Sequence, residues 1–494
     1  MNHHPGRVLV ASNRGPVSFS LDHDGTLTAR RGGGGLVSGL SDVGLSDLLW
    51  VCSALNDADR TAARQAPDGR LDQAGYDTPV PVQMLPIPPD TFDLAYNAVS
   101  NSIIWFVHHL LYDTPNQPRF GAEFARQWAA YQDYNAAFAD ALAAAASPSP
   151  ASPSPASPGP AGTGVRVMVQ DYHLALVPGM LARRCPGVRI AHFSHTPWAP
   201  PEYYRLLPEE AGRALLEGIL GADHAGFHSE RWADAFIDCC REILGAEVDR
   251  DAGLVTYQGH RCRVGVHPLG VDAAELRRRA AEPDVEEHIT ALSRATNGAR
   301  LIVRIDRTEL SKNIVRGLAA YRELLSEHPE LHGHVTHLAC AYPSRYDLPQ
   351  YREYTASVEQ IAGEISAEFR RPGWEPLILQ VKDDYARSLA AYRLADVVVV
   401  NPIRDGMNLV AKECPVLSDR GCVLILSRET GACPELGRDA LVVNPYDVSA
   451  TARAMYQALV MPQPERERRC AALARTAGAR PPGQWLADQL NALD

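Results

Sequence analysis

Lysine is nearly absent from this chain of 494 residues, which contains 48 basic residues but only three lysines, Lys312, Lys382 and Lys412. A compact ammonium and a forked guanidinium bind anions in different ways, so the two residues do not replace each other at every site. A lysine that persists in such an arginine-rich chain is therefore a hint that arginine does not serve at that position.

Long apolar runs are also missing, because the chain has no stretch of about 18 uncharged apolar residues, and this argues against a membrane-spanning helix. The first residues, MNHHPGRVLVASNRG, lack the apolar core and the small-residue cleavage site of a signal peptide. We therefore expect a cytoplasmic protein that does not bind a membrane.

Cysteine is sparse, with ten residues and no C-x-x-C pair, so we expect reduced thiols instead of a disulfide framework or a zinc site. Basic residues, 48 in all, are also outnumbered by 59 acidic ones. The net charge of −11 at pH 7 argues against a general nucleic-acid-binding surface. A phosphate ligand would need basic residues that are gathered locally.

Short apolar runs alternate with amphipathic stretches twice along the chain, from RVLVAS to ADHAGFHS and again from ARLIVRID to CVLILS. Such alternation predicts an α/β fold in which helices cover both faces of a parallel sheet. We expect two Rossmann-like, doubly wound domains, residues 1–265 and 266–475, that face each other across a cleft. Residues 476–494 are expected to form a helical segment that can cross back to the first domain. Residues 147–164, rich in Ser, Pro and Ala, predict a flexible insert.

Polar loops follow the strands of the second series, at the edge where open parallel sheets bind ligands. In RTELSKN, Arg307 and Lys312 can grip a diphosphate as a fork and a point charge. A solvated loop gives the same pattern, and taken alone this loop favours that simpler explanation.

The next polar loop, NPIRDGMNLVAKE, begins with a tight turn at Asp405 and Gly406. The residues that follow are Met407, Asn408 and Leu409. Their amides are expected to open a helix and to donate to hydroxyls or phosphates. Glu413 should lie about two turns into that helix, where a carboxylate can hold two ribose hydroxyls. A capped helix after a turn is the plain alternative, but both loops should share one sheet edge.

Two features of the first series are candidate ligand sites. The glycine run at residues 32–35 can approach a phosphate closely, although a flexible loop explains it as well. Asp171, in DYH, and His195, in HFSHTPW, follow neighbouring strands and can reach one pocket as ligands of sugar hydroxyls. For His195 alone, a structural role is the more common alternative.

Several catalytic signatures are missing. The glycine run lacks the third glycine of a dinucleotide fingerprint, no Gly-Lys pair forms a P-loop, and no G-x-S-x-G elbow occurs. The D-x-D strings at residues 22–24, 57–59 and 249–251 look like polar loops. A metal-bound sugar nucleotide is therefore the weaker interpretation, and we expect neither a metal nor another cofactor.

Nine motifs in a fixed order make the chain resemble the trehalose-6-phosphate synthases, the retaining glycosyltransferases of family 20. They are SNR, GGL, YNAVSNSIIW, DYH, HTPW, RTELSK, PSR, RDGMNLVAKE and NPYD. The resemblance covers nearly the whole chain and implies a GT-B fold with the active site between its two domains. It also implies transfer of glucose, with retention of the α configuration, from a nucleotide sugar to glucose 6-phosphate. Small molecules are thus the expected partners, and self-association into a homo-oligomer is left open.

The resemblance assigns roles to individual residues. The residues that it implies for the donor's diphosphate are Gly35, Arg307 and Lys312. The residues that it implies for the donor's glucose and ribose are His195, Asp405, Gly406, Met407, Asn408, Leu409 and, at the ribose, Glu413. The residues that it implies for the acceptor are Arg14, Tyr96, Trp105, Asp171 and Arg345. Among all of these, the expected catalytic residues are Arg307, Lys312, Asp405 and His195.

The mechanism that the resemblance implies is a front-face reaction, in which the departing diphosphate oxygen accepts the acceptor's proton. A retaining hydrolase would instead place two carboxylates around the anomeric carbon, and no well-supported pair is found in the sequence. The protein then contributes positioning and electrostatic stabilisation.

Two residues depart from the family pattern. Asn313 stands where the family usually has glycine, and Asp383 stands where many relatives have an aromatic residue near the nucleotide base. A carboxylate suits guanine, which offers two neighbouring donor groups, better than uracil, which offers one. We therefore expect Asp383 to bind the donor and GDP-glucose to be preferred over UDP-glucose. The alternative is that Asp383 caps the following helix and faces solvent.

Other functions remain as alternatives. Within the same class they are glucosylglycerol-phosphate synthesis and a pseudo-sugar coupling that forms a C–N bond. A non-catalytic, synthase-like regulator is opposed by the intact Arg307, Lys312, Asp405 and Glu413. A nicotinamide dehydrogenase is opposed by the missing dinucleotide fingerprint.

Overall fold

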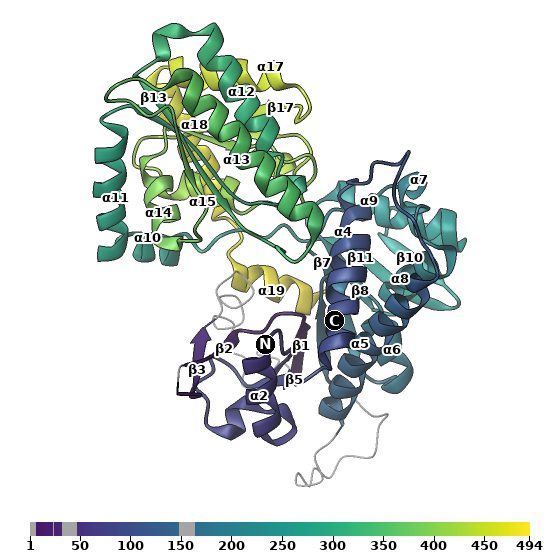
Figure 1. Cartoon of the computed structure of the whole chain (residues 1–494). Coiled ribbons are helices and arrows are strands. Elements are labelled where there is room, and N and C mark those ends of the chain that lie inside the picture. Colours follow the sequence, from purple (N-terminus) through teal and green to yellow (C-terminus); the bar gives the residue numbers. More distant parts are fainter. Residues whose placement is uncertain (1–5, 23, 32–46, 148–163) are drawn as a thin grey trace. The chain divides into compact units, whose positions relative to one another are not determined.

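The computed structural model divides the chain into two compact units (Figure 1). Unit 1 comprises Met1–His267 together with Pro482–Asp494, and unit 2 comprises Pro268–Pro481. The described residues are 6–22, 24–31, 47–147 and 164–494. The glycine run that ends at Gly35 and most of the Ser/Pro/Ala insert therefore lie outside the described residues.

Unit 1 is built on a sheet whose described strands have the order β5-β4-β1-β6-β7-β8-β11-β10-β9. Neighbours from β5 through β11 run parallel, as predicted, whereas β10 pairs antiparallel with both β11 and β9. The sequence patterns did not indicate this antiparallel rim. The strands are β1 (Val8–Ser12), β4 (Leu48–Ser53), β5 (Val82–Leu85), β6 (Arg166–Gln170), β7 (Arg189–Ser194), β8 (His224–Phe227), β9 (Glu247–Asp249), β10 (Leu254–Tyr257) and β11 (His260–Val266), with a separate hairpin of β2 (Val17–Leu21) and β3 (Leu27–Arg31).

The helices of unit 1 correct one expectation about its loops. Residues 57–59, expected in a polar loop, begin a helix. Asp59 is buried, and its carboxylate is satisfied by hydrogen bonds from Phe19 N at 2.6 Å and Leu55 N at 3.0 Å. The helices are α2 (Asp57–Gln65), α3 (Pro89–Asp93), α4 (Trp105–His108), α5 (Glu123–Ala146), α6 (Val177–Arg184), α7 (Pro201–Tyr204), α8 (Glu209–Leu220), α9 (Glu230–Cys239) and α19 (Pro482–Asn491), with π-helical segments η3 (Leu94–Ile104) and η5 (Cys240–Leu244). None of the helices in the described ranges is long and apolar enough to cross a membrane.

The C-terminal helix α19 packs onto unit 1. Trp485 is 1% exposed, its Nε1 donates to His267 O at 3.0 Å, and its ring meets that of Phe193 edge to face at 4.9 Å. The preceding helix, α18 (Gln463–Ala477), belongs to unit 2. The segment that returns to unit 1 thus begins at Pro482.

Unit 2 is built on a fully parallel sheet with the strand order β14-β13-β12-β15-β16-β17. The strands are β12 (Arg300–Arg307), β13 (Val335–Tyr342), β14 (Leu377–Gln380), β15 (Val397–Val400), β16 (Val423–Ser427) and β17 (Leu441–Val443). The remaining helices are α10 (Ala273–Ala280), α11 (Pro283–Thr296), α12 (Ile314–Glu327), α13 (Pro349–Phe369), α14 (Tyr385–Leu394), α15 (Val410–Leu417), α16 (Cys433–Leu436) and α17 (Val448–Val460).

The sheet of unit 2 is covered on both faces, as Figure 1 shows. Leu301 and Val303 of β12 enter one apolar cluster with helices α14, α15 and α18, whereas Ile302 enters another with α12, α13 and α17. Successive side chains of a strand point to opposite faces, so a continuous apolar run such as RLIVRI is buried on both sides.

Both sheets reverse their strand order beside their first strand. In unit 1 the chain moves outward from β1 through β4 and β5, and then returns to β6 on the other side of β1. In unit 2 it moves from β12 through β13 and β14, and then returns to β15. Ligands of doubly wound sheets bind beyond the carboxyl ends of the strands at such a switch point. The loops after β1, β6, β12 and β15 are therefore where a site is expected.

Candidate active site

The loops after β12 and β15 meet in unit 2, which confirms that they share one sheet edge. Lys312 ends a short 3-10 turn, and its Nζ lies 2.6 Å from Asp405 Oδ2. Burial of the ammonium opposes its charge, but the carboxylates of Asp405, Asp306 and Glu309 outweigh this effect and raise the pKa of Lys312. A charged ammonium is therefore held at the switch point of unit 2.

Two arginines stand beside the same loop and share one carboxylate, that of Glu309. Arg307, the last residue of β12, places its Nη1 3.2 Å from Glu309 Oε1, and Arg345 Nη1 lies 3.8 Å from the same oxygen. Arg345 also donates to Tyr351 Oη at 2.7 Å. Glu309 was not among the residues predicted for the site. Its position, two residues after Arg307 in a loop predicted to bind an anion, could have indicated that it pairs with a basic side chain.

The segment after β15 was predicted wrongly in one respect. Helix α15 begins at Val410, so residues 406–409 precede it, and Glu413 lies in its first turn instead of two turns in. The physical reason is Asn408, whose φ of +90° is not helical and whose Oδ1 accepts a hydrogen bond from Ala411 N at 3.1 Å. The N-cap residue of α15 is Leu409, and the Asn408 side chain, one position earlier, accepts from the first turn, so the helix cannot begin before Leu409.

Glu413 is half-buried, and this burial raises the pKa of its carboxyl group. Tyr392 Oη donates to Glu413 Oε2 at 3.1 Å, a contact that was not predicted from the sequence. The Oε1 atom accepts no hydrogen bond from a described residue. One oxygen is thus fixed by the protein while the other remains an acceptor for a ligand.

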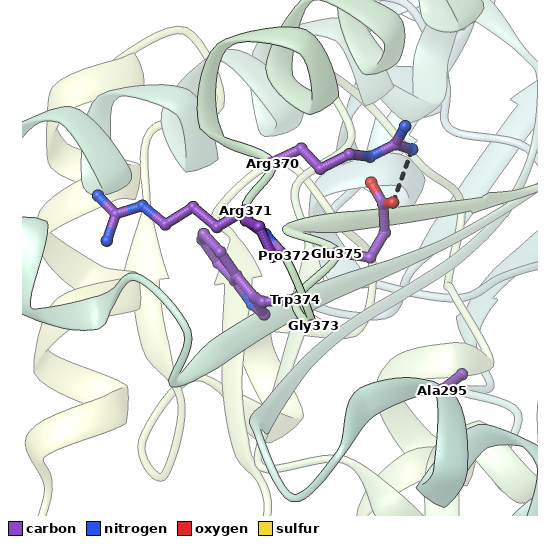
Figure 2. Close-up of a pocket in the computed structure, with 7 residues that line it drawn as sticks. All are labelled: Ala295, Arg370, Arg371, Pro372, Gly373, Trp374 and Glu375. Carbon is purple, nitrogen blue, oxygen red and sulfur yellow. Dashed lines mark ion pairs between the residues drawn. The ribbon is translucent and has the colours of Figure 1, made fainter.

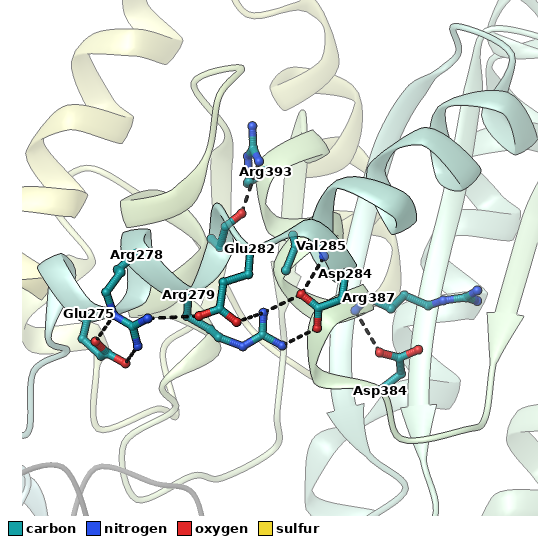
Figure 3. Close-up of polar contacts among 10 residues, drawn as sticks. Glu275, Arg278, Arg279, Glu282, Asp284, Val285, Asp384, Arg387 and Arg393 are labelled. Carbon is teal, nitrogen blue, oxygen red and sulfur yellow. Dashed lines mark hydrogen bonds and ion pairs between the residues drawn. The ribbon is translucent and has the colours of Figure 1, made fainter.

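Asp384, not Asp383, caps helix α14. Its Oδ1 accepts a hydrogen bond from Arg387 N at 3.0 Å, as Figure 3 shows, and its Oδ2 lies 3.2 Å from His288 Nε2. Asp383 is exposed and forms neither a hydrogen bond nor an ion pair with any residue in the described ranges. In the alternative to base binding, the capping role of Asp383 is therefore wrong, whereas its exposure to solvent agrees with that alternative.

Asn313, the departure from the family's glycine, adopts the left-handed backbone that glycine favours, with φ +58° and ψ +37°. Its Nδ2 donates to Asn401 O at 2.9 Å and to Pro445 O at 2.7 Å, and its Oδ1 accepts from Arg316 Nη1 at 2.9 Å. These two carbonyls follow β15 and β17. Asparagine thus keeps the backbone of glycine and adds a link between three loops at the ligand edge.

In unit 1 the structure brings Asp171 and His195 together. They follow the adjacent strands β6 and β7, and His195 N donates to Asp171 Oδ1 at 3.1 Å. Asp171 has φ +72° and ψ +169°, a combination normally confined to glycine. Strain of this kind at the carboxyl end of a strand, beside a switch point, is typical of a functional residue.

The His195 ring is neutral, because burial lowers its pKa to about 4. Its Nε2 lies 2.9 Å from Gln170 Oε1, and the tautomer with the proton on Nε2 donates to this oxygen and leaves Nδ1 as an acceptor. The side chain can therefore accept a hydrogen bond from a sugar hydroxyl, and it does not supply positive charge.

The other predicted residues of unit 1 lie on the loop after β1 and around the π-helical segment η3. Arg14 follows β1, is exposed, and forms no ion pair within the described part of the chain. Tyr96 lies in η3, and its ring stacks between Phe92, at 5.1 Å, and His173, at 5.5 Å. Trp105 follows η3 directly and is buried. Such π-helical stretches occur often at functional sites, which agrees with a role for this segment.

A pocket of about 660 Å³ in unit 2 contains none of the predicted site residues (Figure 2). Its lining residues are Ala295, Arg370, Arg371, Pro372, Gly373, Trp374 and Glu375. Most of them precede β14, so the pocket lies at the edge where the strands begin. It is therefore separate from the loops described above.

Comparisons with known proteins agree with this arrangement. The model of glycosyltransferase family 20 matches residues 6–494. The bifunctional trehalose-6-phosphate synthase/phosphatase of Thermoproteus tenax is 33% identical over 496 residues, which cover 99% of this chain and 63% of that protein. The chain thus spans less than two thirds of this relative's length.

In two further comparisons the match covers most of this chain and most of the protein with which it is compared. The UDP-forming α,α-trehalose-phosphate synthase of Yarrowia lipolytica is 32% identical over 472 residues, which cover 93% of each chain. A solved trehalose-6-phosphate structure from E. coli, bound with UDP-2-fluoro glucose, is 27% identical with a TM-score of 0.82 and covers 98% of this chain and 99% of that one. These matches confirm the GT-B fold and the resemblance drawn from the motifs. The chain belongs to glycosyltransferase family 20.

Proposed function

We propose that the chain transfers glucose from a nucleoside diphosphate glucose to glucose 6-phosphate, with retention, and so forms α,α-trehalose 6-phosphate. The observation that carries the proposal is the charged Lys312 ammonium on Asp405, with Arg307 close by in sequence at the end of β12. An ammonium and a guanidinium at a switch point suit a departing diphosphate. The carboxylates of Asp405 and Glu309 hold these two cationic groups in place.

The proposed roles follow the chemistry of each side chain. Arg307 and Lys312 stabilise the charge that develops on the departing diphosphate. Asp405 and the amides of residues 406–409 hold the donor's glucose, and the free oxygen of Glu413 accepts from its ribose. The proposed ligands of the acceptor are Arg14, Tyr96 and Arg345 at its phosphate, Asp171 at its hydroxyls and Trp105 beside the sugar.

In the proposed reaction the bond between the anomeric carbon and the diphosphate oxygen breaks. The acceptor hydroxyl forms its new bond on the same face of the sugar, and its proton passes to the departing oxygen. The neutral His195 accepts a hydrogen bond from a glucose hydroxyl and takes no proton, since burial lowers its pKa to about 4. The protein contributes positioning and electrostatic stabilisation.

We further propose that the reaction needs no metal, because Arg307 and Lys312 supply the charge that a divalent cation supplies elsewhere. Turnover is expected to persist in excess EDTA, within about twofold of the untreated enzyme. The measurement is product formation before and after chelation, with magnesium added back. Activity that vanishes with EDTA and returns with magnesium would contradict the proposal.

For the donor base we propose guanine, on the strength of Asp383. Its carboxylate is exposed and unengaged, because Asp384 takes the capping role. A carboxylate accepts two parallel hydrogen bonds from a guanine edge, whereas uracil presents carbonyl oxygens beside its single N–H. Preference could then reach roughly 1–3 kcal/mol, or about ten- to a hundredfold, by analogy with bidentate base recognition. The relative from Y. lipolytica is UDP-forming by name, so the base requires a direct test.

In the experiment the protein is incubated with glucose 6-phosphate and one donor at a time, UDP-, GDP- or ADP-glucose, and the product of each reaction is identified. Asp383→Ala is expected to reduce the ratio of kcat/KM for GDP-glucose over UDP-glucose towards one. Lys382→Ala, a change at the exposed neighbour, serves as the control and should keep the ratio. A preference for UDP-glucose in the native protein would refute the proposed base but not the proposed reaction.

The same assay, repeated with glycerol 3-phosphate in place of glucose 6-phosphate, separates the alternatives. Glucosylglycerol-phosphate synthesis predicts a product with glycerol 3-phosphate and none with glucose 6-phosphate. A non-catalytic regulator predicts no product with any donor and acceptor. Formation of α,α-trehalose 6-phosphate is the result that the proposal requires.

A further inference from the structure

The carboxylate of Glu309 is completely buried between two guanidinium groups. Its Oε1 lies 3.2 Å from Arg307 Nη1 and 3.8 Å from Arg345 Nη1, and Ser344 Oγ donates to the same oxygen at 3.2 Å. The Glu309 side chain is 0% exposed, whereas that of Arg307 is 56% exposed. One buried oxygen therefore contacts the ends of both basic side chains.

Arg345 is held from several directions. Its φ of +49° places it in the left-handed region, its Nη1 donates to Tyr351 Oη at 2.7 Å, and its guanidinium lies 5.5 Å from the centre of the Tyr351 ring. The side chain of Arg345 is only 9% exposed. Glu309 supplies the negative charge in this packing, and a buried charge is stable only when it is paired.

We propose that Glu309 is a positioning residue that links the donor's diphosphate-binding arginine to the acceptor's phosphate-binding arginine. This inference rests on the proposed function, which assigns Arg307 to the donor and Arg345 to the acceptor. When the donor's diphosphate engages Arg307, Glu309 loses part of its pairing with that arginine and depends more strongly on Arg345. Occupancy of one phosphate site thereby affects the orientation of the basic group in the other, which is a coupling between the two sites.

The same unit contains a matched control. Asp396 is buried, and its carboxylate lies 3.2 Å from Arg420 Nη1 and 3.0 Å from Arg466 Nη2, so it also joins two arginines. It directly precedes β15 and therefore lies at the opposite edge of the sheet from Glu309. If such a carboxylate had only a structural role, its replacement by the amide should have the same effect on stability and on the two KM values at Glu309 as at Asp396.

The test compares steady-state kinetics of E309Q, E309D and D396N. E309Q should raise the KM for glucose 6-phosphate and the KM for the donor together, each by about tenfold, by analogy with the loss of a carboxylate that orients a metal ligand. E309D keeps the charge and should stay within about threefold of the native values. D396N should lower the melting temperature and leave both KM values within about twofold.

A double-mutant cycle identifies the link itself. If Glu309 acts through Arg345, the two changes are not additive. The KM for glucose 6-phosphate of the double variant E309Q/R345A should then differ from that of R345A alone by less than about twofold. Full additivity would overturn the inference. An unchanged or lowered KM for glucose 6-phosphate in E309Q would also overturn it, since the carboxylate would then merely compete with the ligand.

Calorimetric binding of glucose 6-phosphate, GDP and UDP to the same variants separates this inference from the proposed function. One outcome is that the native protein forms no product while the effects of E309Q and R345A on the dissociation constants are still non-additive. In that case the proposed function fails and the positioning role stands. If the native protein forms product while the dissociation constants and KM values are additive, the positioning role fails alone. A native protein that binds none of these anions refutes both.

Discussion

At the scale of single residues, the three lysines separate clearly by their surroundings. Lys412 is buried and Lys312 is half-buried, and both make short contacts, Lys412 to Glu435 at 2.6 Å and Lys312 to Asp405 at 2.6 Å. Lys382 is exposed. A guanidinium is wider than an ammonium and does not fit where one nitrogen is enclosed at this distance. The hint taken from lysine scarcity thus remains a prediction, and the contacts of Lys312 and Lys412 make these the two positions where it applies.

Replacing Lys312 by arginine is expected to lower kcat about a hundredfold, because one misplaced contact to a developing oxyanion costs roughly 3 kcal/mol. The charge is retained in this variant, so the loss would come from geometry alone. The measurement is kcat at saturating concentrations of both substrates.

The control for this change is Lys382→Arg, at an exposed position, which should turn over within about twofold of the native rate. If Lys312→Arg turned over equally fast, charge without geometry would be enough, and the importance of the compact ammonium would be disproved.

At the scale of elements, the loops that end the strands determine how the site is assembled. Asn313 joins the loop after β12 to carbonyls that follow β15 and β17. Asn313→Gly keeps a permissive backbone but removes these bonds, so it should lower the free energy of unfolding by about 1–3 kcal/mol and raise the KM for the donor. Asn313→Ala should be worse, since alanine disfavours a positive φ. Thermal unfolding and donor kinetics measure both effects.

The matched control for Asn313 is Asn297, which ends helix α11 with φ +47° and is exposed. Asn297→Gly keeps the same kind of backbone but removes no side-chain link between loops. It should change the unfolding free energy by only a few tenths of a kcal/mol. Equal destabilisation by both glycine variants would show that the conformation, and not the link, explains the effect at Asn313.

The sequence predicted the contacts that follow from strand order and missed those that depend on side-chain conformation. Lys312 and Asp405 follow adjacent parallel strands, so their meeting could be derived from alternation of elements alone. The start of α15 could not, because it depends on the left-handed backbone of Asn408. Nor could the roles of Glu309 and Tyr392, which are visible only once distant segments pack together.

At the scale of the whole molecule, acid is expected to weaken the fold through buried histidines. His337 is fully buried, and neither ring nitrogen has a hydrogen-bond partner among the described residues. Burial lowers the pKa of His337 to about 3, whereas the unfolded chain has a value near 6.5. Below pH ~6.5 the unfolded state therefore binds the additional proton, and stability falls as the pH drops towards the folded pKa.

His337→Phe removes this linkage and should flatten the dependence of stability on pH. Relative to pH 7, the native protein should lose about 2 kcal/mol more than the variant at pH 5, an amount that follows from the difference between pH 5 and the unfolded pKa. Urea unfolding at the two pH values measures it. Parallel curves for the two proteins would rule out His337 as a source of acid sensitivity.

The packing of α19 on unit 1 has a consequence for the order in which the chain matures on the ribosome. Unit 2 is one uninterrupted stretch, Pro268–Pro481, whereas unit 1 needs both Met1–His267 and Pro482–Asp494. All residues of unit 2 are therefore available before Trp485 has been synthesised. The second unit in the sequence can complete its fold first, while the surface around Phe193 in the first unit stays uncovered until residues 482–494, which follow unit 2, have been synthesised.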